Sequence, residues 1–160
     1  MSLSDVSSII NNYTGRARVV LEYSLLMKRL VGEAKQSGFS RDSWSPVAEL
    51  VATDQFRRVG NFKEVMDWPA YITFLTDWAR SSEWDCSFRR VSEVGDVVFL
   101  ELEERSKVGD YQNVVNSVSV YAFNPDDKIR HIDVYLQMEM PSPEMLKSYV
   151  NVDLNSGSHA

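Results

Sequence analysis

The hydrophobic period of the chain changes at Ser82, and this change constrains the fold more than any other feature. Before Ser82, apolar residues recur every three or four positions, which is typical of amphipathic helices. After Ser82 they alternate with polar residues, which is typical of half-buried strands. Helices followed by hairpin-linked strands predict an α+β domain, with the helices packed on one face of an antiparallel sheet.

Three helices are predicted in the first half. The longest spans residues 16–36, and Gly38 is placed to end it. A short helix begins at Ser45-Pro46, an N-cap followed by a proline in the first turn, and runs to about residue 51. A short strand is expected over residues 55–59. Asp67 predicts the N-cap of a third helix, whose apolar stripe comprises Tyr71, Phe74, Leu75 and Trp78.

Long strands are predicted for the second half. Trp84, Cys86 and Phe88 alternate with polar residues, and Gly95-Asp96 marks a hairpin turn into a strand over residues 97–107. Further strands are expected over residues 113–123 and 128–140, joined by the turn at residues 124–127, with a short helix near residues 143–150. Such a sheet bends, so the helices are expected to cap a cone that encloses a pocket.

Bulk composition narrows the class of protein. The 160 residues suit one domain over residues 16–150, preceded by a loose lead over 1–15 and followed by a disordered tail over 151–160. A net charge of −6 argues against nucleic acid and anionic membranes as partners. No apolar run is long enough to span a bilayer, and the N-terminal residues do not form a signal peptide. The single thiol, Cys86, reads as packed core and suits a reducing, cytoplasmic location.

Three stretches carry a family resemblance: ELVATDQFRRVG, VMDWPAYITFLTDW and DDKIRHIDVYL. In their order, the chain resembles the nuclear-transport-factor-2-like superfamily, in particular its SnoaL-like polyketide-cyclase branch. The resemblance implies a cystatin-like cone that binds a small hydrophobic molecule. It also implies a chemistry that needs no cofactor. Fold transfers across such families better than activity does.

The resemblance points to a catalytic pair on the last strand. SnoaL-like cyclases place an acid/base aspartate in an H-x-D motif facing the cavity, and the matching residues are His131 and Asp133. Ile132 stands where the family usually has Trp. The ketosteroid-isomerase branch has its base on the first strand, where this chain has a basic residue within residues 54–59, so ketosteroid isomerisation is disfavoured.

The two faces of the last strand leave two arrangements open. One face carries Ile132, Val134, Leu136 and Met138, and the other carries His131, Asp133, Tyr135 and Gln137. Either the aliphatic face meets the helices, or the polar face lines the cavity and the aliphatic face packs against a partner sheet. The resemblance favours the second arrangement and therefore a homodimer through the sheet. Burial would then raise the pKa of Asp133 and suit it to proton transfer, and Tyr135 would donate to a developing oxyanion.

Other candidate residues are aromatic or basic. Core or cavity positions are expected for Tyr23, Trp44, Trp68, Tyr71, Trp78, Trp84, Phe99 and Tyr121. The pairs Arg57-Arg58 and Arg89-Arg90 would each split between two strand faces. Ion pairs to residues 101–104 are their favoured use, although one arginine facing the cavity would hold a carboxylate. No spacing of His, Cys or Asp matches a metal site, and no phosphate loop or nucleophile elbow is present.

The sequence therefore predicts a small-molecule-binding SnoaL-like protein. One reading adds cofactor-free acid/base catalysis by Asp133 and His131, such as cyclisation or isomerisation next to a carbonyl. The alternative is a non-catalytic ligand-binding or assembly module of the same fold, so whether the protein is an enzyme stays open. A pocket filled by its own aromatic side chains would favour the alternative.

Overall fold

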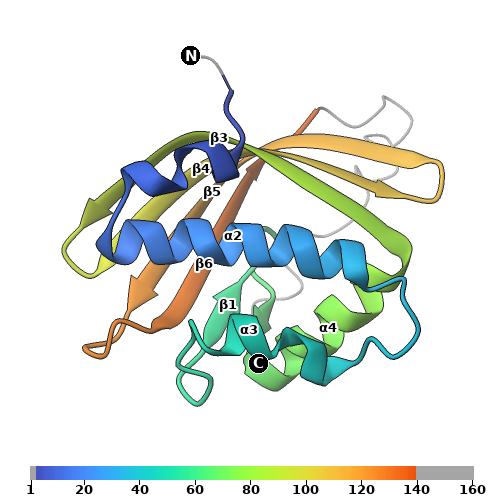
Figure 1. Ribbon diagram of the computed structural model, residues 1–160, viewed down its shortest axis with the longest axis horizontal. Helices are drawn as coiled ribbons and strands as arrows, with labels where there is room; N and C mark the ends of the chain where they lie inside the picture. The colour runs from blue at the N-terminus through green and yellow to red at the C-terminus, as the bar shows by residue number, and fades with distance from the viewer. Residues whose placement is uncertain (1–2, 140–160) are drawn as a thin grey trace, which may run out of the picture.

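The computed structural model describes residues 3–139. The helical elements precede or cover the sheet: α1 (Val6–Ile9), η1 (Ile10–Asn12), α2 (Gly15–Glu33), η2 (Arg41–Trp44), α3 (Ser45–Ala48) and α4 (Trp68–Ser81). The strands are β1 (Arg57–Val59), β2 (Val65–Met66), β3 (Ser82–Val94), β4 (Val97–Val108), β5 (Tyr111–Phe123) and β6 (Ile129–Gln137). The sheet curves around α2, with α3 and α4 closing the other side, so the predicted α+β architecture is confirmed (Figure 1).

The two long helices begin where the sequence places polar caps. Asp67 accepts a hydrogen bond from the backbone N–H of Ala70 at 3.0 Å, so the predicted N-cap of α4 is confirmed. Thr14 makes no such bond at the start of α2. A residue from the sheet replaces it, because Glu93 Oε2 accepts from the Ala17 N–H at 3.0 Å. The negative carboxylate also suits the positive end of the helix dipole.

The six strands form one sheet in the order β2-β1-β6-β5-β4-β3. Neighbours from β3 to β6 pair antiparallel, as predicted. The pairing of β1 with β6 is parallel, which corrects the expectation of a wholly antiparallel sheet. Strand β2 was not predicted, and it pairs with β1 through only two residues of its own. A register shift between Phe88 and Arg90 marks a bulge, which helps β3 to bend around the helices.

The chain differs from the sequence prediction at its beginning. Within the lead that was expected to be loose over residues 1–15, residues 6–12 form α1 and η1, which bury Val6 and Ile10. Ser4 and Phe88 exchange backbone hydrogen bonds at 3.2 and 2.7 Å, which ties the lead to β3. The helix and the tail predicted over residues 143–150 and 151–160 lie outside the described residues. Within residues 3–139 no helix has the length and apolar character needed to cross a bilayer.

Two tryptophans expected at core or cavity positions, Trp44 and Trp68, lie outside the cone. Trp44 is fully buried, and its Nε1 donates to Thr76 Oγ1 at 3.0 Å. Trp68 packs edge-on against Phe56, with ring centroids 5.4 Å apart. Neither residue lines the cavity inside the cone. Both side chains border a separate hollow between η2, α3 and the start of α4, outside the cone.

Candidate functional site

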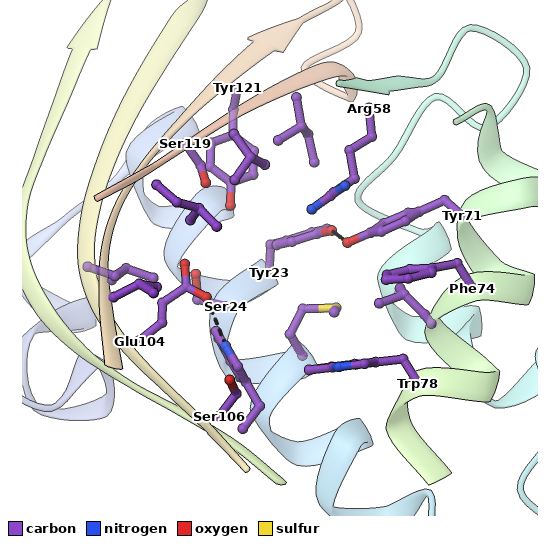
Figure 2. Close-up of a pocket in the computed structure, with 18 of the residues that line it drawn as sticks. Tyr23, Ser24, Arg58, Tyr71, Phe74, Trp78, Glu104, Ser106, Ser119 and Tyr121 are labelled. Atoms are coloured by element: carbon purple, nitrogen blue, oxygen red, sulfur yellow. Dashed lines mark hydrogen bonds between the residues drawn. The ribbon is translucent and has the colours of Figure 1, made fainter. Parts of the chain in front are cut away.

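The cone encloses a cavity of about 250 Å³ between α2, α4 and the inner face of the sheet (Figure 2). Its volume lies just below the usual range of about 300–1,000 Å³ for small-molecule pockets. The walls are mainly apolar, and several polar groups converge on them. Helix α2 contributes Tyr23, Ser24 and Met27, and α4 contributes Tyr71, Phe74, Leu75 and Trp78. The cavity is therefore open space, and its own aromatic side chains do not fill it.

A pair of tyrosine hydroxyls stands at the centre of the cavity. Tyr23 Oη and Tyr71 Oη are 2.8 Å apart, and both side chains are buried. The ring of Tyr121 packs edge-on against Tyr23 at 5.6 Å. Burial raises the pKa of Tyr23 well above its usual value, and it also raises the pKa of Tyr121. Both phenols are protonated at neutral pH. Because one bond between two hydroxyls uses one proton, the pair keeps a second proton to donate to a ligand.

Two charged side chains face the cavity from opposite sides of the tyrosine pair, as Figure 2 shows. Arg58 comes from β1, and its guanidinium carbon lies 5.3 Å from the centre of the Tyr71 ring. Glu104 comes from β4, and its Oε2 accepts a hydrogen bond from Trp84 Nε1 at 2.9 Å. A positive and a negative group thus mark the two sides of a largely apolar space.

The faces of β6 are opposite to those that the family resemblance favoured. Ile132, Val134 and Leu136 line the cavity, so the aliphatic face meets the helices. His131 and Asp133 lie on the outer face, joined by a 2.9 Å contact between Nε2 and Oδ1. Their placement corrects the expectation that this pair lines the cavity. Apolar side chains prefer the interior of the cone, and the alternation of β6 then directs its polar residues outward.

The predicted aromatic residues divide into three groups. Tyr23, Tyr71 and Tyr121 line the cavity, as do Trp78 and Trp84. Trp44 and Trp68 belong to the packing described above. The other two correct their predictions: Phe99 and Tyr135 lie on the outer face of the sheet, where 42% and 60% of their surface is exposed. Of the predicted binding residues, the three tyrosines of the cluster line the cavity, and the two residues that point outward do not.

Arg58 belongs to one of the two basic pairs from which a cavity-facing arginine was expected, whereas Glu104 was expected only as an ion-pair partner; strand alternation contains a signal for both. Arg58 follows the fully buried Phe56 by two positions, and Glu104 follows the buried Leu102 by two. The other basic pair makes the predicted ion pairs but does not split between two strand faces, because at the bulge both arginines reach carboxylates on the outer face. Arg90 forms an ion pair with Glu101, and Arg89 lies 3.6 Å from a carboxylate oxygen of Glu103.

Neither a reactive thiol nor a metal cluster is found at the site. Cys86 is buried, as predicted, and burial raises its pKa to about 12, which keeps the thiol protonated and weakly nucleophilic. Among residues 3–139, no three His, Cys, Asp or Glu side chains come together as a metal site would require.

Solved structures of similar shape place this architecture among known folds. An NTF2-like protein of unknown function from Exiguobacterium sp. 255-15 superposes with a TM-score of 0.60 at 14% identity, covering 74% of this chain and 98% of that one. A protein with a ketosteroid isomerase-like fold from Catenulispora acidiphila, solved in complex with trimethylamine, gives 0.56 at 11% identity over 73% and 83% of the two chains. The chain has an NTF2-like fold.

A third neighbour of the NTF2-like fold is classed as a SnoaL-like polyketide cyclase, from Jannaschia sp. CCS1. It superposes with a TM-score of 0.52 at 16% identity over 86% of this chain and 94% of that one. No family model matches the sequence, and no curated protein matches it either. The resemblance drawn from the sequence is thus confirmed for the fold.

Proposed function

We propose that the cone binds a small, mainly apolar molecule that presents an oxygen atom to the Tyr23–Tyr71 hydroxyl pair. The observation that carries this proposal is the open cavity of about 250 Å³, with a hydroxyl proton available at its centre. Apolar walls supply the binding free energy through burial, and a few polar groups set the orientation of the ligand.

A neutral fluorescent probe tests the proposal without testing charge. N-phenyl-1-naphthylamine should bind the protein with increased fluorescence. Ser119→Phe should abolish this binding, because Ser119 lines the cavity and a phenyl ring there would occupy it. Ser92→Phe is the matched control, since Ser92 is exposed on β3. Equal binding by both variants, or no binding by the unmodified protein, would contradict the proposal.

Catalysis, if the protein is an enzyme, is proposed to use Glu104 as the base. Among the cavity-lining residues of the described chain, Glu104 is the single carboxylate. The hydrogen bond from Trp84 holds one of its oxygens and leaves the other to accept a proton. The hydroxyl pair would stabilise a developing oxyanion on a carbonyl substrate. His131 and Asp133 do not line the cavity, so neither is proposed as the base.

Deuterium exchange separates this catalytic proposal from the non-catalytic alternative. With 2-tetralone in D₂O, NMR should show faster exchange of the protons next to the carbonyl in the presence of the protein. Glu104→Gln should remove the acceleration while probe binding persists. If the protein binds the probe but exchange stays at the buffer rate, the fold serves as a ligand-binding module in this chain.

We further propose that two copies pair through the outer face of the sheet. There Phe99 lies opposite Val120, and Tyr135 lies opposite Val118, which gives an apolar centre. Ion pairs such as Arg105–Glu103 border it, so the same patch offers both charges to a second copy. Sedimentation should show a dimer. Phe99→Asp should yield a monomer, and Phe62→Asp, which changes an exposed residue on the β1–β2 turn, should not. A monomeric unmodified protein would refute the pairing.

The reducing cytoplasm is the proposed compartment. Cys86 is a free, buried thiol and the single cysteine of the chain. No intrachain disulfide can therefore form, and an oxidising compartment would not stabilise the fold.

A further inference from the structure

Arg58 carries a positive charge into the cone and makes no side-chain hydrogen bond to any residue that the structure describes. Strand pairing places Arg58 beside Ile132, so its side chain lies on the inner face of the sheet. Only 18% of that side chain is exposed. A guanidinium has five N–H donors, yet none of them makes a hydrogen bond to another residue within 3–139. Burying a charge without such partners is unfavourable, so a ligand group that supplies them would gain binding free energy at this point.

The nearest carboxylate does not satisfy Arg58, because it is engaged elsewhere. Glu64 Oε1 lies 3.8 Å from Arg58 Nη1, which is beyond hydrogen-bond distance. The other oxygen, Oε2, accepts from the backbone N–H of Phe62 at 2.9 Å and so stabilises the β1–β2 turn. Gly60 makes room for this arrangement, since a Cβ there would lie 1.7 Å from Glu64 Oε1.

The surroundings hold the guanidinium in one place. Its carbon lies 5.3 Å from the centre of the Tyr71 ring, within the range of a cation–π contact. Figure 2 shows the end of Arg58 directed toward the hydroxyls of Tyr23 and Tyr71. A ligand oxygen at this point would meet the guanidinium and the free hydroxyl proton together, with both donors already positioned.

We propose that the ligand of the cone is an apolar carboxylic acid, whose carboxylate binds Arg58 and whose hydrocarbon part lies among the aromatic walls. This inference rests on the proposed function and names the chemical class of its ligand. A carboxylate accepts two parallel hydrogen bonds from a guanidinium and neutralises its charge. A neutral carbonyl offers a single oxygen as acceptor and leaves the charge uncompensated.

A matched pair of ligands tests whether a negative charge on the ligand strengthens binding. 4-Phenylbutyrate and 4-phenylbutanamide differ only in the end group, so calorimetry at pH 7.5 compares the carboxylate with a neutral group of the same shape. Hydrogen bonds to charged groups predict that the acid binds about tenfold or more tightly than the amide. Arg58→Gln should remove this preference and leave amide binding in place. Arg58→Lys, which keeps the charge and loses the planar fork, should give an intermediate preference.

Two further variants sharpen the assignment. Arg57→Gln is the matched control. Arg57 is the neighbouring residue in the chain, but its side chain is exposed and donates to the Phe56 carbonyl. It should leave the preference for the acid unchanged. Glu64→Gln removes the competing carboxylate and retains an oxygen for the Phe62 N–H. It should raise the affinity for the acid a few-fold and leave the amide unaffected.

The outcomes distinguish this inference from the proposed function. An acid that binds no better than the amide overturns the carboxylate assignment, and so does a preference that survives Arg58→Gln in a folded variant. Binding of N-phenyl-1-naphthylamine in either case keeps the proposed function. If neither ligand nor that probe binds, both ideas fail together.

Discussion

Removing both hydroxyls of the Tyr23–Tyr71 pair should destabilise the protein no more than removing one of them. The hydroxyls are 2.8 Å apart, and neither has a further hydrogen-bond partner within residues 3–139. Tyr23→Phe leaves the buried hydroxyl of Tyr71 without a partner, and Tyr71→Phe does the reverse. Each single change should lower the free energy of unfolding by about 1–3 kcal/mol. The double change leaves no unpaired group and should cost no more than one single change.

Urea unfolding followed by tryptophan fluorescence measures this cycle. For a chain of this length, a loss of about 2 kcal/mol corresponds to a fall in melting temperature of roughly 4–8 °C. The coupling energy from the four proteins should favour the pair by about 1–2 kcal/mol. Tyr13→Phe serves as the control, because the Tyr13 hydroxyl makes no hydrogen bond to a described residue, and should stay within about 0.5 kcal/mol of the parent. Additive losses in the double variant would refute the reasoning.

Three more predictions concern stability and reactivity. Burial raises the pKa of Tyr23 and Tyr121 above the unfolded value near 10. Their contribution to the free energy of unfolding is therefore fully present below about pH 10. Above that pH it is lost by up to about 1.4 kcal/mol per pH unit for each tyrosine. Urea midpoints between pH 8 and 11 should fall accordingly, and a flat profile would count against the burial of these phenols. Cys86, with a pKa of about 12, should not react with Ellman's reagent at pH 8 until urea unfolds the protein, and rapid labelling of the folded state would contradict its burial. Glu93→Ala should destabilise the protein by about 1 kcal/mol by uncapping α2, whereas the exposed Glu83→Ala should have no effect in the same melting experiment.

The sequence predicted the elements of the fold well where the local signals were strong. The change of period at Ser82, the N-cap at Asp67 and the hairpin at Gly95 all have direct counterparts in the structure. The parallel pairing of β1 with β6 could not be predicted in this way. A three-residue strand carries little periodicity, and its partner lies far along the chain.

The candidate site was harder to predict, because β6 has two plausible faces. The general preference of aliphatic residues for the interior places Ile132 and Val134 correctly, whereas the family motif favoured His131 and Asp133. The motif and the aliphatic pattern of β6 point to opposite faces, and the burial of the aliphatic side chains decides between them. Alternation alone also places Arg58 and Glu104 on the inner face, two residues after the buried Phe56 and Leu102, although the family motif assigns neither of them a role.

The pairing of β1 with β6 has a consequence for how the protein acquires its site. Hairpins such as β3–β4 and β4–β5 join neighbouring segments and can form early, whereas the contact of Arg58 with Ile132 closes a much longer loop. The arginine therefore reaches the cavity only after the final strand has docked. In a refolding experiment, recovery of carboxylate affinity should lag behind recovery of strand structure. Under the proposed function, carboxylate binding would therefore require a chain folded through β6.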